Sequence, residues 1–142
     1  MLIDKVEIQA RIPHSGAMCL LDSVLSWDDV HIVCTTHSHR APDNPLRRDG
    51  RLHAICGVEY AAQAIALHGG LAGGASARPR VGYLASLRDL ACRLPYLDAV
   101  EGDLLVEAEQ LVDEGSRVIY RFALSSKAVE VMSGRAAVVL EA

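Results

Sequence analysis

The segment 54–70 constrains the fold more than any other part of this sequence. It reads AICGVEYAAQAIALHGG, and before its histidine only Glu59 and Gln63 carry strongly polar side chains. Alanine and leucine favour helix, and the run is long enough for about four turns. A helix that is apolar on nearly every side is a buried helix. We therefore expect one central buried helix, and we expect Gly69 and Gly70 to end it.

The rest of the chain has the pattern of strands. Apolar runs on either side of the Asp28–Asp29 pair predict a first hairpin. After the helix come four strand-like runs, at residues 81–93, 104–112, 117–125 and 128–142. The second and third of these runs alternate between apolar and charged residues, which indicates antiparallel strands with one buried face, and Glu114–Gly115 predicts the hairpin between them. We expect the buried face to carry Leu104, Val106, Ala108, Val112, Val118, Tyr120, Phe122 and Leu124.

Two strands, a buried helix and about four more strands define an α+β chain. An antiparallel sheet wrapped around one long helix, the hot-dog fold, satisfies this order because the apolar face of the sheet then covers the helix. The alternative is another α+β packing, in which the helix lies on an open sheet. The length of 142 residues fits a single domain that spans 1–142.

Composition excludes several classes of function. The net charge of −4 gives no basic surface for nucleic acid. No apolar stretch reaches the roughly 18 residues of a membrane helix, and the N-terminus has no apolar signal-peptide core. We therefore expect a cytoplasmic protein that binds neither nucleic acid nor membrane. The dispersed cysteines predict buried, reduced thiols at Cys19, Cys34, Cys56 and Cys92.

Three motifs follow one another along the chain. The first is IPHSGAMCLLDSV at 12–24, and the second is GVEYAAQA at 57–64. The third comprises Arg93, Pro95, Gly102 and Asp103. In this order they resemble the FabZ-type 3-hydroxyacyl-ACP dehydratases, which have the hot-dog fold.

A longer segment narrows the resemblance. Residues 44–63, NPLRRDGRLHAICGVEYAAQ, look most like the divergent dehydratase-like subunits of aryl-polyene and related clusters. The resemblance implies that Glu59 is a catalytic acid. It also places the family's catalytic histidine at Pro45, about fourteen positions before that acid, where this chain cannot supply it. A histidine would then have to come from elsewhere.

Dehydration of a 3-hydroxyacyl thioester requires a base at the α-carbon, an acid at the leaving hydroxyl, and donors for the thioester oxygen. Glu59, which we expect to be buried, suits one proton transfer. The backbone N–H groups of Ala54 and Ile55 at the helix start could hold the thioester carbonyl. We also expect Gln63, one turn beyond Glu59, to contact the substrate. The alternative is that Glu59 is a structural carboxyl hydrogen-bonded to Gln63.

Candidate histidines for the second proton transfer are His39 and His53. His37 and His39 would share one face of a strand, from which His39 could reach Glu59 of a neighbouring subunit. His53 precedes the helix and would lie beside an entering substrate. The alternative for each is a structural or surface histidine. His37, His39 and Asp43 lack a fourth metal ligand, so we expect no metal and no cofactor.

Arg47, Arg48 and Arg51 cluster before the helix. They could receive the phosphate of a phosphopantetheine arm or the acidic carrier protein itself, although a solvated loop of charges would have the same pattern.

Three functions remain open at this point. The first is a dehydratase, or dehydratase-like subunit, that acts on chains borne by acyl carrier protein. The second is a non-catalytic partner of an active homologue, and the third is a hot-dog thioesterase. Hot-dog domains pair through sheet edges, so the resemblance implies a homodimer or a heterodimer with a dehydratase homologue.

Overall fold

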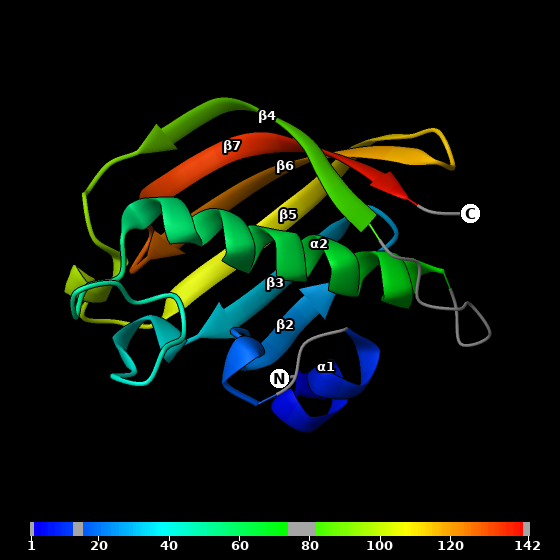
Figure 1. Ribbon diagram of the computed structural model, residues 1–142. Helices are drawn as coiled ribbons and strands as arrows, with labels where there is room; N and C mark the ends of the chain where they lie inside the picture. Colours follow the sequence, from blue (N-terminus) through cyan, green and yellow to red (C-terminus); the bar gives the residue numbers. More distant parts are fainter. Residues whose placement is uncertain (1, 13–15, 74–81, 141–142) are drawn as a thin grey trace.

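The computed structural model describes residues 2–12, 16–73 and 82–140. One long helix, α2 (Gly57–Ala72), lies in the concave face of a seven-stranded antiparallel sheet (Figure 1). The order across the sheet is β1-β2-β3-β5-β6-β7-β4. The strands are β1 (Ile3–Asp4), β2 (Ser23–Trp27), β3 (His31–Thr36), β4 (Gly82–Cys92), β5 (Leu104–Asp113), β6 (Arg117–Ser126) and β7 (Val129–Leu140). This is the hot-dog fold that the sequence predicts.

Helix α2 forms where the apolar run predicts it, and its sheet-facing side chains make up much of the core. Tyr60, Ala64 and Leu67 are fully buried in that core, and α2 as a whole packs against β3, β5 and β6. The predicted stop at Gly69 and Gly70 is wrong, because both glycines lie within the helix, which continues to Ala72. Glycine weakens a helix but does not exclude it.

Both predicted hairpins are confirmed. β2 pairs with β3 across Asp28–Asp29, and β5 pairs with β6, with a turn in which Gly115 has φ +82°. A register shift between Gln110 and Val112 turns the end of β5, so Val112 is exposed and not buried as predicted. The other seven residues expected on this face are buried.

A short N-terminal helix, α1 (Lys5–Arg11), is absent from the sequence prediction. Its N-cap is Asp4, whose carboxylate accepts a hydrogen bond from Glu7 N at 3.0 Å. Ile8 is its one buried residue. Seven residues with a single buried position give too little periodicity to identify a helix from sequence.

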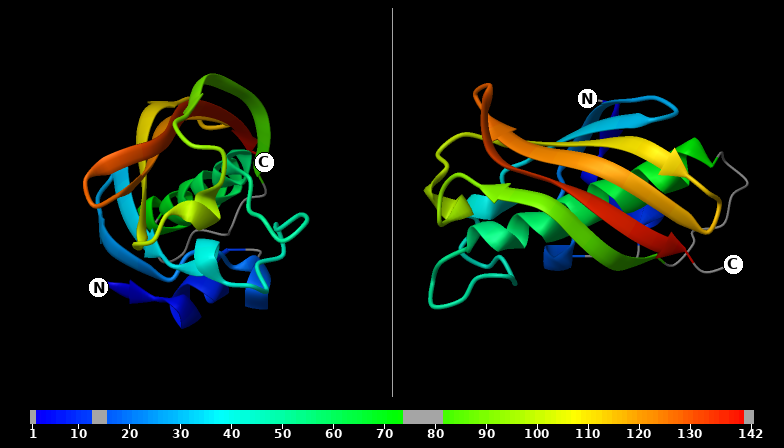
Figure 2. Two further views of the ribbon diagram at one scale, coloured as in Figure 1. Left: turned by 90° about the vertical axis from the view of Figure 1, so that its left-hand side faces the viewer. Right: turned by 90° about the horizontal axis from the view of Figure 1, so that it is seen from above.

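Strand β4 forms one edge of the sheet and is exposed along nearly its whole length. Figure 2 shows it as the free margin of the curved sheet, beside β7. Tyr83, Leu84 and Leu90 on this strand are large apolar residues with exposed side chains. The sheet therefore ends in an edge that exposes three large apolar side chains.

Candidate active site

An open pocket of about 550 Å³ lies at the start of the central helix. It is lined by His53, Ala54, Ile55, Cys92, Arg93, Leu94 and Pro95. The structure thus brings together three residues that the sequence predicts for the site, His53, Ala54 and Ile55, and places them opposite the end of β4. Cys92, which the sequence predicts to be buried, is exposed in the wall of this pocket.

Two short backbone segments build the mouth of the pocket. Leu97 N donates to Leu52 O at 2.8 Å, and Ala54 N donates to Pro95 O at 2.9 Å. The prediction that the Ala54 N–H is free to hold a substrate is therefore wrong. Ile55 lies in the short 3-10 turn (Ala54–Cys56) that precedes α2. Its N–H has no acceptor within that turn and makes none of the turn or loop hydrogen bonds of the described chain. Ile55 remains the candidate oxyanion donor.

Glu59 lies one turn after Ile55, in the first turn of α2. Its side chain is partly exposed, so the prediction of a buried carboxyl is wrong for this chain by itself. The sheet covers only the opposite side of the helix. Along the side that it leaves open runs a row of partly or fully exposed residues, which we call the uncovered stripe: Ile55, just before α2, and then Glu59, Ala62, Ala66 and Gly69.

Gln63 has a structural role in this chain. It is buried, its Oε1 accepts from Leu20 N at 2.9 Å, and its Nε2 donates to Met18 O at 2.8 Å. Its amide therefore fastens α2 to the segment that precedes β2. A substrate could not use these atoms without breaking that link.

His39 does not lie on a strand. β3 ends at Thr36, and His39 belongs to a short 3-10 turn (Ser38–Arg40). The side chain is fully buried, its Nε2–H donates to Val100 O at 3.0 Å, and burial lowers its pKa. His37 is exposed, and its Nδ1 lies 2.8 Å from Asp22 Oδ2. The predicted shared face of the two histidines is therefore wrong.

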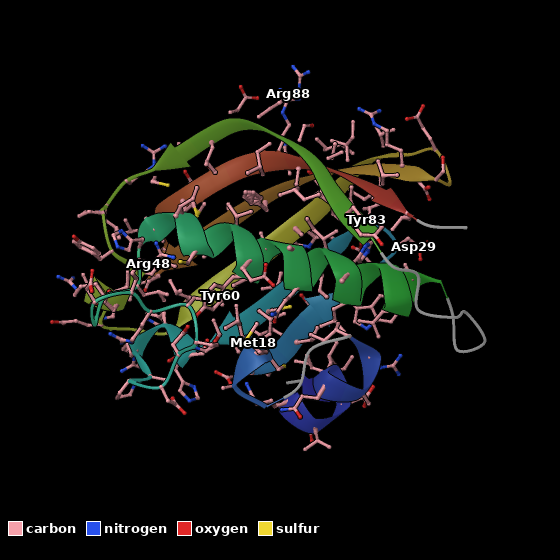
Figure 3. The ribbon with its side chains drawn as sticks, in the orientation of Figure 1. Met18, Asp29, Arg48, Tyr60, Tyr83 and Arg88 are labelled. Atoms are coloured by element: carbon pink, nitrogen blue, oxygen red, sulfur yellow. The ribbon has the colours of Figure 1, made fainter. Side chains whose placement is uncertain are left out.

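The arginine cluster is divided among three roles. Arg47 donates to the carbonyl oxygens of Ala41 and Gly50, at 2.9 and 2.7 Å, and so braces its own loop. Arg51 pairs with Asp98. Arg48 is exposed on the loop at the N-terminal end of α2 (Figure 3). Arg93, which the sequence did not single out for binding, lines the pocket itself.

Pro45 stands where the resemblance places a catalytic histidine, and the side-chain amide of the preceding residue, Asn44, fixes the loop that carries it. Asn44 is buried and donates to Ser38 O at 2.9 Å and to Tyr60 Oη at 3.0 Å. Its Oδ1 accepts from Leu46 N at 2.9 Å. Tyr60, seen on α2 in Figure 3, also lies with its Oη 2.8 Å from Ser38 Oγ, and burial raises its pKa.

Two further observations concern the described residues as a whole. Within 2–12, 16–73 and 82–140, no three His, Cys, Asp or Glu side chains gather as metal ligands. No helix in these ranges is both long and apolar enough to cross a membrane. Pro13 and His14 of the first motif lie outside the described residues.

A sheet wrapped around one helix, with a pocket at the helix start, defines the class of hot-dog domains. Within that class, the family model described as ApeP dehydratase, ApeP-like, matches residues 6–141. The chain belongs to this family. A comparison with curated protein sequences found no match.

Solved structures share the fold. The dehydratase heterocomplex ApeI:P from Xenorhabdus doucetiae has a TM-score of 0.83 and 21% identity, over 95% of this chain and 91% of that one. A mutant of the thioesterase PA1618 from Pseudomonas aeruginosa has a TM-score of 0.67 and 15% identity, over 99% and 95%. An HP0420 homologue from Helicobacter felis has a TM-score of 0.66 and 12% identity, over 99% and 93%.

Proposed function

We propose that this chain is a subunit of a dehydratase that acts on 3-hydroxyacyl thioesters carried by acyl carrier protein, in fatty-acid or polyene-type biosynthesis. The observation that carries the proposal is the position of Glu59. It is the one charged residue of the uncovered stripe, and it lies one helical turn from the pocket and the Ile55 N–H. His53 and Ile55 line the pocket, and Glu59, which does not line it, follows Ile55 by one helical turn.

The reaction breaks the Cα–H and Cβ–O bonds of the substrate and releases water. One group removes the α-proton, and another gives a proton to the departing hydroxyl. We assign these two transfers to Glu59 and to His53, and we assign stabilisation of the enolate oxygen to Ile55 N–H. No cofactor is needed for this proton balance.

The partner in this proposal is a dehydratase homologue of the same fold. β4 is the outermost strand on its side of the sheet and exposes Tyr83, Leu84 and Leu90, and the uncovered stripe of α2 is lined by small residues that permit close approach. The solved relative from Xenorhabdus doucetiae is a heterocomplex. A second hot-dog subunit joined at β4 would cover both surfaces and remove Glu59 from water.

In this proposal the phosphopantetheine arm of the acyl carrier protein enters beside the pocket. Arg48 is exposed next to the helix start, and Arg93 lines the pocket while it pairs with Glu130 at 3.2 Å. Guanidinium groups bind phosphate with bidentate geometry, which suits the phosphopantetheine phosphate. Arg47 is left out of this role because its donors already serve loop carbonyls.

The test is dehydration of a carrier-linked 3-hydroxyacyl substrate, followed by mass spectrometry. The chain is assayed alone and together with ApeI of the Xenorhabdus heterocomplex. We expect enoyl thioester when both subunits are present. Release of free acid and thiol would support a thioesterase, and full activity of a complex that carries Glu59→Gln would reduce this chain to a non-catalytic partner.

A further inference from the structure

His53 has an exposed side chain, yet its surroundings fix where it lies. The backbones of His53 and Tyr96 face each other as an isolated antiparallel bridge. The hydrogen bonds between Leu97 and Leu52 and between Ala54 and Pro95 close this bridge on both sides. The Cα atoms of His53 and Tyr96 are therefore held opposite each other at the mouth of the pocket.

The two rings are also in contact. The centroids of His53 and Tyr96 are 5.2 Å apart, with an interplanar angle of 58°. An exposed histidine ordinarily samples several rotamers, and ordering it costs side-chain entropy. Contact with a neighbouring ring reduces that sampling before any substrate arrives.

Tyr96 is itself braced by a cation and a carboxylate. The guanidinium carbon of Arg51 lies 3.9 Å from the centre of the Tyr96 ring. Arg51 Nε donates to Asp98 Oδ2 at 2.8 Å, and Asp98 Oδ1 accepts from Leu52 N at 2.8 Å. Burial would raise the pKa of Asp98, but the Leu52 N–H and the Arg51 guanidinium outweigh it and keep that pKa below its usual value.

We propose that Tyr96 is a positioning residue that holds the His53 ring toward the pocket, with Arg51 and Asp98 as its brace. The inference rests on the proposed function, because it assigns a role to the same His53. It explains why Arg51, which the sequence groups with a phosphate-binding cluster, is committed to Asp98 and Tyr96 in the structure. The fixed ring would be aligned for proton transfer before the thioester enters.

The experiment compares Tyr96→Leu, Tyr96→Phe, His53→Ala and the double variant His53→Ala/Tyr96→Leu in the dehydration assay, in the same complex. Tyr96→Leu should lower kcat about ten- to hundredfold with KM unchanged, because a displaced group costs rate more than binding. Tyr96→Phe keeps the ring and should rescue the rate. In the His53→Ala background, Tyr96→Leu should cause no further loss.

A second measurement, by NMR, does not depend on catalytic activity. The NMR resonances of the His53 ring should lose their ring-current shift in Tyr96→Leu and keep it in Tyr96→Phe. Equal rates for Tyr96→Leu and wild type, or a full additional loss in the His53→Ala background, would overturn the positioning role. Full activity of His53→Ala would instead remove His53 from the proposed function, and the positioning role with it.

Discussion

At the scale of the residue, the site depends on which side of a short helical stretch a side chain occupies. Ile55 and Glu59 are one turn apart and both lie on the uncovered stripe, whereas Tyr60, the next residue, is fully buried. Tyr60 and Asn44 use their polar atoms within the chain. Glu59 lies on the side of α2 that the sheet does not cover, and its side chain is partly exposed.

Glu59→Gln tests whether Glu59 transfers a proton in the reaction. The substitution keeps the shape of the side chain and removes its capacity to transfer a proton. We expect kcat of the complex to fall by about 10²–10⁴-fold, with an unchanged circular dichroism spectrum. Glu101→Gln, at an exposed loop position, is the matched control and should keep full turnover. Retained activity in Glu59→Gln would remove this residue from the mechanism.

Gly57 makes a second prediction at this scale. A Cβ there would overlap Met132 Sδ, so Gly57→Ala must displace a fully buried methionine. We expect a loss of about 1–3 kcal/mol in the free energy of unfolding, measured in urea.

Gly70→Ala is its control. Gly70 lies in the same helix, and a Cβ added there would meet nothing within 4 Å. Alanine is the better helix former there, so we expect a gain of up to about 1 kcal/mol. An unchanged free energy of unfolding for Gly57→Ala would contradict this prediction and show that the Met132 side chain of β7 can move aside without loss of stability.

At the scale of the element, the sequence predicts what depends on periodicity. The buried helix, the alternating strands β5 and β6, and both hairpins follow from local patterns. The site is less predictable, because the hydrogen-bond partner of a given N–H group or side chain often comes from a segment that is distant in the sequence. Nothing near Ala54 in the sequence shows that its N–H meets Pro95 O, and nothing near His39 shows that Val100 accepts from its ring.

The loop between β3 and α2 illustrates the same limit. Asp22 accepts from His37 N at 2.7 Å, and the Thr36 and Ser38 hydroxyls both donate to Leu20 O. These bonds turn the chain out of the strand that alternation alone would continue. A sequence pattern reports side-chain faces, but it does not report which backbone carbonyl will be nearby.

Asn44→Ala tests how far this loop depends on one amide. The variant removes the bonds to Ser38 O, Tyr60 Oη and Leu46 N. We expect a loss of about 1–3 kcal/mol in the free energy of unfolding, because buried partners are left unsatisfied. Asp43→Ala, one residue earlier and exposed, should change stability little. Equal values for the two variants in urea titrations would contradict a locking role for Asn44.

At the scale of the whole molecule, the sheet is asymmetric. One margin ends in the two-residue β1, beside α1, whereas the other margin is the eleven-residue β4. Leu84 pairs with Val138, whose side chain packs against the core, and yet Leu84 is 46% exposed. A side chain on the inner face of a sheet that remains in water indicates where a second subunit would complete the core.

Leu84→Lys tests that edge. A charge at this position would be buried by any subunit that covers β4, so we expect association with the partner dehydratase to be lost while the chain stays folded. Light scattering during size-exclusion chromatography gives the molar mass of the assembly. Val129→Lys, at an exposed hairpin end, is the control. An intact complex with Leu84→Lys would place the interface elsewhere.

The register shifts in β4 have a consequence for this chain before it meets a partner. β4 departs from regular pairing between Leu84 and Ser86 and again between Arg88 and Ala91, where Asp89 has φ +55°. A straight edge would accept almost any extended peptide, including another copy of itself, and so would seed fibres. An edge bent at two places accepts only a strand with a matching shape. The irregularity of β4 would therefore disfavour self-association through this edge while the edge is uncovered.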